Sequence, residues 1–180
     1  MPVLPLDVFW EKLAESQLLS TKQIADVRAA YQESKIESGS QENQTAIAAQ
    51  WLVRQRVLTL WQAKQLLKGN ASNFFLGDYR LLDKRGMSPG GVVYQGRHEP
   101  TKQVVSLVPI DDSVSQRVDV WTEVVRQVER AAETTSPILS RTWALESAGG
   151  NRFIVCEDLV SQVSVAEGSQ TLKWSVVEAV

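Results

Sequence analysis

The sequence predicts an α+β fold: an N-terminal four-helix unit, then a five-stranded antiparallel sheet covered by one helix. In residues 1–69 the apolar side chains recur at helical spacing, and after residue 76 the pattern changes to the alternation typical of strands. The later elements follow the order three strands, one helix, two strands. That order favours an antiparallel sheet with the helix packed on one of its faces.

Composition indicates a globular protein, because 43% of the 180 residues are hydrophobic and 22% are charged. The net charge of −2 argues against binding to nucleic acid or to an anionic membrane, which needs clustered positive charge. Cys156 is the single cysteine and His98 the single histidine, so neither an intrachain disulfide nor a Cys- or His-based zinc site is expected. We therefore expect neither nucleic acid nor a direct membrane contact among the partners.

The N-terminal sequence MPVLPLDVFWEKLAES lacks the basic start and the apolar core of a signal peptide. No uncharged apolar run reaches the ~18–20 residues of a membrane span. One cysteine also fits a reducing compartment. We expect a soluble, cytoplasmic fragment, and leave open a membrane anchor further along a longer parent chain.

The first helical hairpin is predicted from apolar spacing and from a cap. Val8, Phe9, Leu13 and Ala14 lie at helical spacing. Residues 20–23 (STKQ) have the form of a capping box, which starts a second helix. The apolar stripe of that helix consists of Ile24, Val27, Ala30 and Tyr31. The polar residues 33–43 are expected to form a loop.

A third helix is expected over residues 45–54, and a fourth from the second capping box at residues 59–62 (TLWQ) to Lys68, with Gly69 as its stop. A weak repeat at a spacing of 39 relates the two halves. The matched pairs are Val8 with Ile47, Leu13 with Leu52, Leu19 with Leu58, Ser20 with Thr59 and Gln23 with Gln62. This predicts two packed helical hairpins, either by duplication or because any two helical hairpins share such a pattern.

Residues 70–76 are interpreted as a linker before the sheet. Alternating patterns predict strands over residues 79–85, 92–97 and 104–110, separated by a Gly-rich turn at 86–91 and a turn at 99–101. Pro109 lacks an N–H donor, so the third of these strands should end or bulge there.

The second half of the sheet region begins with a helix over residues 113–134, ended by Pro137. Its apolar stripe consists of Trp121, Val124, Val125, Val128 and Ala132. Two further strands are expected over residues 140–146 and 152–157, with a turn at 148–150. The stretch 159–167 is ambiguous, and 171–180 has the pattern of another helix start.

With these elements placed, residues 77–160 resemble the N-terminal lobe of bacterial Hanks-type (eukaryotic-like) serine/threonine protein kinases. The sequences VLTLWQAKQLLKG and FFLGDYRLLDK are similar to the helical region that precedes the kinase domain in some multidomain bacterial kinases. The resemblance implies a helical module over 1–69, a kinase N-lobe-like domain over 77–162 and the truncated start of a large-lobe-like region over 163–180.

The family's phosphate-binding loop has the form GxGxxGxV. Its first glycine matches Gly86, its second falls on Ser88, its third matches Gly91 and its valine matches Val93. The second glycine normally lets backbone amides approach the phosphates, and Ser88 followed by Pro89 adds bulk and removes a donor. Without its neighbouring motifs, the stretch Pro89-Gly90-Gly91 is interpreted as a plain hairpin turn.

The family's charged pair is also missing. Residues 105–108 (VSLV) stand where the family has Val-Ala-Ile/Leu-Lys, so Val108 occupies the position of the phosphate-binding lysine. Counting back from Ser136-Pro137, the family's His-Pro, places the ion-pairing glutamate at Gln127. The two losses agree with each other, because a partly buried glutamate without its lysine would be costly.

Residues 153–157 resemble the fifth strand that runs into the hinge, so Cys156 falls at the gatekeeper position and Glu157 begins the hinge. We interpret Cys156 as a small buried hydrophobe rather than a reactive thiol. The HRD and DFG motifs of the large lobe do not occur in the sequence. The interlobe face near Pro109, Cys156 and residues 159–160 is expected to be covered by 163–167 or by self-association.

Three hypotheses follow. The first is a catalytically inactive, pseudokinase-type signalling or scaffold module that binds protein partners, a second copy of itself included. The alternative is the N-terminal fragment of a longer, atypical ATP-binding serine/threonine protein kinase. The third is a structural or oligomerisation module that presents its tryptophans to a core or an interface: Trp10, Trp51, Trp61, Trp121 and Trp143. No cofactor is expected, and residual ATP binding stays open.

Overall fold

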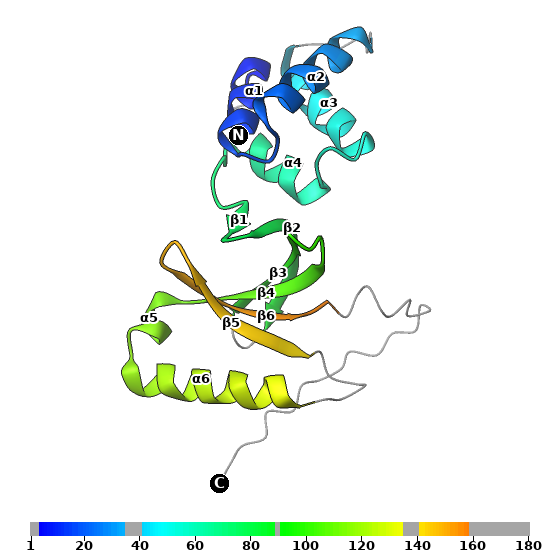
Figure 1. Ribbon diagram of the computed structural model, residues 1–180. Helices are drawn as coiled ribbons and strands as arrows, with labels where there is room; N and C mark the ends of the chain where they lie inside the picture. Colours follow the sequence, from blue (N-terminus) through cyan, green and yellow to red (C-terminus); the bar gives the residue numbers. More distant parts are fainter. Residues whose placement is uncertain (1–3, 35–40, 89–90, 135–140, 159–180) are drawn as a thin grey trace, which may run out of the picture.

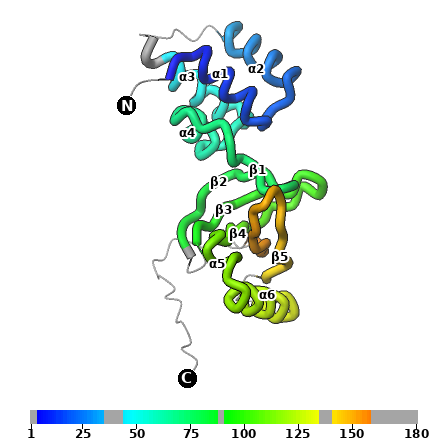
Figure 2. Tube along the Cα trace, turned by 90° about the vertical axis from the view of Figure 1, so that its left-hand side faces the viewer, coloured from blue at the N-terminus to red at the C-terminus, as the bar shows by residue number. Residues whose placement is uncertain are grey.

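The computed structural model describes residues 4–34, 41–88, 91–134 and 141–158. It shows a four-helix unit at one end, a curled sheet in the middle and a long helix on the far side of the sheet (Figures 1 and 2). This is the α+β class that the sequence predicts. The predictions for residues 159–180 lie outside the described residues.

The helical unit consists of two hairpins. Its helices are α1 (Leu6–Glu15), α2 (Thr21–Glu33), α3 (Gln41–Arg54) and α4 (Leu60–Leu67). Helix α3 begins four residues before the predicted start, in a stretch that was expected to be loop. Glutamine and glutamate form helices readily, so α3 extends into polar residues that carry no apolar pattern.

The core of the helical unit comes mainly from α1, α3 and α4. Its members that are less than 2% exposed are Phe9, Leu13, Ala48, Ala49, Leu52 and Leu66. Helix α2 packs more loosely, because none of its residues is buried. Ile24, Val27 and Tyr31 of its predicted stripe are half-buried, whereas Ala30 is exposed. The stripe is therefore narrower than the spacing indicates.

Both hairpins use the same turn, 39 positions apart. Gln17 after α1 (φ 57°) and Arg56 after α3 (φ 58°) adopt the left-handed conformation common at helix C-termini. Both predicted capping boxes are present: Ser20 with Gln23 starts α2, and Thr59 with Gln62 starts α4. The repeat in the sequence therefore corresponds to two helical hairpins with matching connections.

Gly69 ends α4 as predicted. It is left-handed (φ 81°), its N–H donates to the Leu66 carbonyl at 2.8 Å, and the Asn70 N–H donates to the Gln65 carbonyl at 3.1 Å. This pair of hydrogen bonds defines a Schellman motif.

The interpretation of residues 70–76 as a linker is wrong for its last part. Phe74 is 2% exposed and joins the helical core, with its ring edge-on to Trp61 at 5.8 Å. Phe75 and Leu76 form a short strand that pairs with the next one. The two units are thus joined by residues that belong to the core of one and the sheet of the other.

The sheet has six antiparallel strands rather than the five expected, in the order β1-β2-β3-β4-β6-β5. The strands are β1 (Phe75–Leu76), β2 (Tyr79–Ser88), β3 (Gly91–His98), β4 (Val104–Ile110), β5 (Thr142–Ala148) and β6 (Asn151–Glu157). The additional strand is β1. Gly149 (φ 58°) and Gly150 (φ 84°) form the tight two-residue turn between β5 and β6, as the sequence indicates.

Two strand boundaries differ from the prediction. Strand β2 continues to Ser88, so Gly86 pairs with Val93 inside the ladder, next to a register shift, instead of opening a turn. Strand β4 runs through Pro109, which pairs with Phe153. The pairing of β4 with β3 stops at Leu107, and a proline is tolerated where the ladder continues on one side only.

The predicted helix over residues 113–134 is divided into α5 (Asp112–Ser115) and α6 (Val118–Glu133). Arg117 between them has an extended backbone and serves as the N-cap of α6. Helix α6 runs along β5 on one side of the sheet (Figure 1). The Arg152 guanidinium of β6 stacks over the Trp121 ring of α6 at 4.2 Å.

The other face of the sheet curls around its own core. That core consists of Tyr79, Leu81, Val105, Leu107, Phe153 and Val155. The Tyr79 hydroxyl donates to Glu146 Oε1 at 2.7 Å, which links β2 to β5 across the curl. Within the described ranges, none of the helices has the length and apolar character needed to cross a membrane.

The helical unit is docked on β2. Thr59 Oγ1 donates to the Leu82 carbonyl at 2.6 Å, and Arg80 Nη2 donates to the Leu18 carbonyl at 2.8 Å. Trp61 packs edge-on against Phe74 and Tyr94, each at 5.8 Å, and belongs to the apolar clusters of both units. The helical unit and the sheet are therefore in direct contact through hydrogen bonds and ring packing, in addition to the chain segment that connects them.

Candidate functional site

The sheet register aligns one row of residues across four strands: Gln95 of β3 pairs with Ser106 of β4, which pairs with Cys156 of β6, which pairs with Thr142 of β5. Successive side chains of a strand point to opposite faces. Because Val105 and Leu107 face the curled core, Ser106 and Val108 face the other way. We call this side the candidate face; it carries Val93, Gln95, Ser106, Val108 and Cys156.

A buried carboxylate at the end of β6 accepts hydrogen bonds from two side chains of this face. Asp158, at the end of β6, is 2% exposed. Its Oδ2 accepts from Gln95 Nε2 at 2.5 Å, and its Oδ1 accepts from Ser106 Oγ at 3.3 Å. Asp158 thereby ties the end of β6 to β3 and β4. The sequence analysis missed it, although Gln95 and Ser106, polar residues in otherwise apolar strands, were a signal that a polar partner lies nearby.

Val108, which the resemblance matches to the family's lysine, lies in an apolar setting. Val108 is half-buried and pairs with Ile154. Gln127, which the resemblance matches to the family's glutamate, is exposed on α6, and its Nε2 donates to Glu123 Oε1 at 2.9 Å. Arg126 donates to the same carboxylate at 2.6 and 2.8 Å, and these hydrogen bonds lower the pKa of Glu123. Val108 therefore pairs with an apolar residue inside the sheet, whereas Gln127 is engaged with a neighbour on its own helix.

The residues matched to the glycine-rich loop lie along one hairpin. Gly86 pairs with Val93, and Ser88 pairs with Gly91, so all four belong to the β2–β3 ladder. Residues 89–90, which include Pro89 of the expected turn, lie outside the described residues. Met87 near the tip is 73% exposed.

Cys156 and Glu157 point to different faces. Cys156 is half-buried, its Sγ lies 3.9 Å from Thr142 Oγ1, and burial raises the pKa of its thiol. A raised pKa disfavours the thiolate, which is the reactive form, in agreement with its interpretation as a small hydrophobe. Glu157 pairs with Val105 and, by alternation, does not belong to the candidate face.

On strands β3, β4 and β6, as the structure describes them, no lysine or arginine lies in the middle of the candidate face. Two arginines share this side of the sheet, each near a strand end. Arg97 donates to Glu99 Oε1 at 2.8 Å. Arg152 stacks on Trp121 and donates to the Ser115 carbonyl at 3.1 Å. Neither lies at the Val108 position.

In the part of the chain that the structure describes, no three His, Cys, Asp or Glu side chains gather as a metal-ion site would require. No family model matches the chain, and no curated protein matches it. The geometry of the site therefore carries the functional argument.

Proposed function

We propose that this chain is a kinase-like module that does not transfer phosphoryl groups and that acts by binding protein partners. The observation that carries the proposal is the setting of Val108. Phosphoryl transfer depends on positive charge held against the phosphates, and this position presents a valine beside Ile154. Gln127, the expected ion-pair position, is engaged with Glu123 on the outside of α6.

The arrangement of elements supports the kinase-like part of the proposal. After the two-residue strand β1, three strands (β2–β4), the helices α5 and α6, and two strands (β5 and β6) follow one another along the chain, and α6 packs on the sheet. This is the order that the sequence resemblance implies for a kinase small lobe.

The chemistry of the candidate face supports the inactive part. The carboxylate of Asp158 is buried under hydrogen bonds from Gln95 and Ser106 rather than presented to a ligand. A general base must reach the proton that it removes, and a buried, engaged carboxylate does not. Away from the two arginines near the strand ends, the other side chains of the face are apolar or neutral, which suits packing against a partner better than catalysis.

The inactive part is tested by thermal unfolding with ATP, with and without magnesium. A ligand present at 100 times its Kd stabilises the folded state by about 2.7 kcal/mol, which is a shift of several degrees for a chain of this size. We expect no saturable, magnesium-dependent shift at millimolar ATP. Adenosine and inorganic triphosphate, titrated separately, identify which part of the nucleotide causes any shift.

A saturable shift that needs both the adenosine and the magnesium would contradict the proposal. It would favour the alternative, in which the chain is the N-terminal part of a longer atypical ATP-binding kinase.

The partner-binding part is tested first with a second copy of the chain. Two exposed apolar side chains on the sheet unit offer contacts, Met87 (73% exposed) and Val118 (79% exposed). Sedimentation velocity over a wide concentration range should show association that Met87→Glu or Val118→Glu weakens. A strict monomer with no binding of an apolar dye rejects self-association, and the partner is then a different protein.

A further inference from the structure

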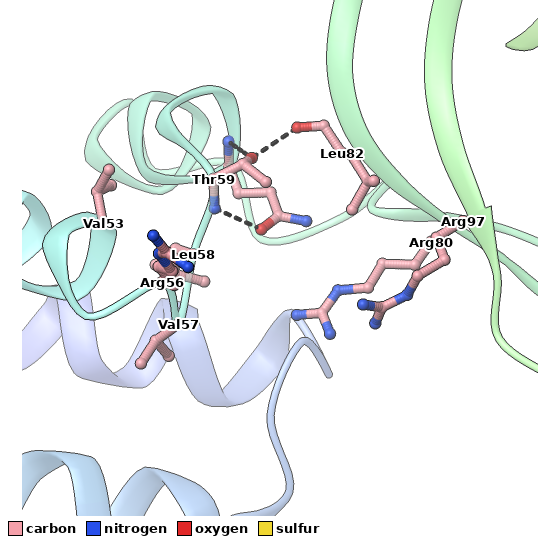
Figure 3. A pocket seen from close by; sticks show the side chains of 9 residues that line it. Val53, Arg56, Val57, Leu58, Thr59, Arg80, Leu82 and Arg97 are labelled. Carbon is pink, nitrogen blue, oxygen red and sulfur yellow. Dashed lines mark hydrogen bonds between the residues drawn. The ribbon is translucent and has the colours of Figure 1, made fainter. Parts of the chain in front are cut away.

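A pocket of about 320 Å³ lies where the helical unit meets the sheet, and three of its nine lining residues are arginines (Figure 3). Arg56 comes from the turn after α3, Arg80 from β2 and Arg97 from β3. The other lining residues are Val53, Val57, Leu58, Thr59, Gln62 and Leu82. We infer that this arginine pocket binds a phosphate group, either as free phosphate or as part of a small phosphorylated molecule.

The first observation is a pair of like charges. Arg80 and Arg97 are ladder partners on neighbouring antiparallel strands, so their side chains lie on the same face directly opposite each other. Like charges in this position repel each other. Figure 3 shows both side chains reaching from the sheet toward the helical unit. Partial burial, and then the charge of Arg97, lower the pKa of Arg80, against the opposing charge of Glu99.

The second observation is the shortage of carboxylates. None of the nine lining residues is acidic. Glu99, the nearby carboxylate, accepts from Arg97 through Oε1 at 2.8 Å and from Lys102 through Oε2 at 2.7 Å. One negative charge is thus shared by two cations. Arg80 has no ion-pair partner in the described part of the chain.

The third observation is a buried donor without an acceptor. Arg80 Nη2 donates to the Leu18 carbonyl, but its Nε is buried and has no hydrogen-bond partner among the described residues. Buried polar groups are almost always paired in folded proteins, so an exception needs an explanation, and a bound water or ion is one of those known. Arg80 therefore lines the pocket with a guanidinium held by the Leu18 carbonyl, and its buried Nε–H is left without an acceptor.

Arg56 lies on the opposite side, on the helical unit. Its left-handed backbone (φ 58°) places it in the turn between α3 and α4, and its side chain is exposed. A phosphate group accepts paired hydrogen bonds from guanidinium groups and would balance the excess positive charge. The volume lies at the lower end of the range of small-ligand sites, so the ligand is small.

The inference is tested by isothermal titration calorimetry of the whole chain with inorganic phosphate, at ionic strength held constant with chloride. Arg56→Ala should weaken phosphate binding about tenfold, the loss of one charge-assisted interaction. Arg54→Ala is the matched control. Arg54 lies two positions before Arg56, carries the same charge and is also exposed, but it does not line this pocket. It should leave the affinity unchanged.

A second variant addresses Arg80 itself. Arg80→Lys keeps the charge but removes Nε and the guanidinium fork, and it should also weaken phosphate binding. Circular dichroism must show that this variant is folded, since Arg80 also contacts the Leu18 carbonyl. Glycerol phosphate and phosphate are titrated in parallel. Tighter binding of glycerol phosphate assigns the site to a phosphorylated small molecule, and tighter binding of phosphate assigns it to the free ion.

Three outcomes would overturn the inference: phosphate binding no stronger than chloride binding, acetate bound as tightly as phosphate, or equal loss in Arg56→Ala and Arg54→Ala. The test is independent of the proposed function, because neither Val108 nor Gln127, which carry that proposal, lines the arginine pocket. A shift with ATP that disappears in Arg56→Ala reports the arginine pocket. A shift that persists in that variant reports a nucleotide site elsewhere and counts against the proposed function alone.

Discussion

The side-chain amide of Gln62 forms a bridge to Leu81. Its Nε2 donates to the Leu81 carbonyl at 2.7 Å, while its Oε1 accepts from the Thr59 N–H at 3.0 Å. Gln62 is 1% exposed. Gln62, which completes the capping box of helix α4, therefore also binds strand β2. The start of the helix and its attachment to the sheet both depend on this side chain.

We predict that Gln62→Ala lowers the free energy of unfolding by about 2–4 kcal/mol, through loss of a helix cap and through a buried Leu81 carbonyl left without its donor. Gln23→Ala is the matched control. Gln23 occupies the equivalent position 39 residues earlier, where its capping box is exposed. It should cost less than about 1 kcal/mol. Urea unfolding followed by circular dichroism measures both, and equal losses would contradict the bridging role.

The Trp61 ring should couple the two units in unfolding. It packs on Phe74 in one apolar cluster and on Tyr94 in the other. We expect Trp61→Ala to lower stability by about 2–4 kcal/mol and to separate thermal unfolding into two transitions. Trp51→Ala, which removes a ring packed on Tyr31 in the helical cluster alone, should keep one transition. Calorimetry distinguishes these outcomes, and a single transition in Trp61→Ala would show that the coupling lies elsewhere.

Tyr79 should make stability depend on alkaline pH. Burial first, then the hydrogen bond and the charge of Glu146, raise its pKa well above the ordinary 10.0. Above pH 10 the unfolded chain therefore loses this proton while the folded chain keeps it, and the free energy of unfolding falls as pH rises. At lower pH the full contribution is present. Tyr79→Phe should remove this part of the slope and cost about 1 kcal/mol at neutral pH.

The measurement for Tyr79 is urea unfolding at a series of pH values above neutrality, with ultraviolet absorbance to follow tyrosinate formation. A weaker slope remains in Tyr79→Phe, because burial also raises the pKa of Tyr31. If the variant and the parent chain show the same slope, Tyr79 ionises equally in both states and the hydrogen bond to Glu146 does not hold its proton.

The Cys156 thiol should react slowly with disulfide reagents in the folded chain. Its pKa is raised by burial, and its Sγ lies beside Thr142. At mildly alkaline pH, a disulfide reagent should label the folded chain at least an order of magnitude more slowly than the unfolded chain, since the thiolate is the nucleophile. Labelling rates measured with and without urea test this. Equal rates in both states would show an accessible, reactive thiolate.

The sequence was most informative where structure depends on neighbouring residues. Both capping boxes, the Gly69 stop and the Gly149-Gly150 turn follow from local hydrogen bonds and backbone preferences, and all occur as expected. Phe74 and strand β1 were missed because their roles depend on contacts between units. Pro109 was misjudged because tolerance of a proline depends on which neighbouring strand is present beside it.

The candidate face shows the same limit. The resemblance matches Val108 to the family's lysine, but only the structure shows that Gln95 and Ser106 meet the buried carboxylate of Asp158. The arginine pocket was beyond sequence reasoning for a related reason. Two register irregularities in β2 decide which residue faces Arg97, and no local pattern predicts them.

The two matching hairpin connections should differ in how many amino-acid substitutions they tolerate. In the second hairpin Thr59 and Gln62 each serve the helix and the sheet, so a substitution there damages both at once. In the first, Ser20 and Gln23 serve their own helix in an exposed position. A library randomised at both pairs and selected for folded protein should therefore return a narrow set of residues at 59 and 62 and a broad one at 20 and 23. As mutations accumulate, the sequence match between the two hairpin connections would then be lost first at positions 20 and 23.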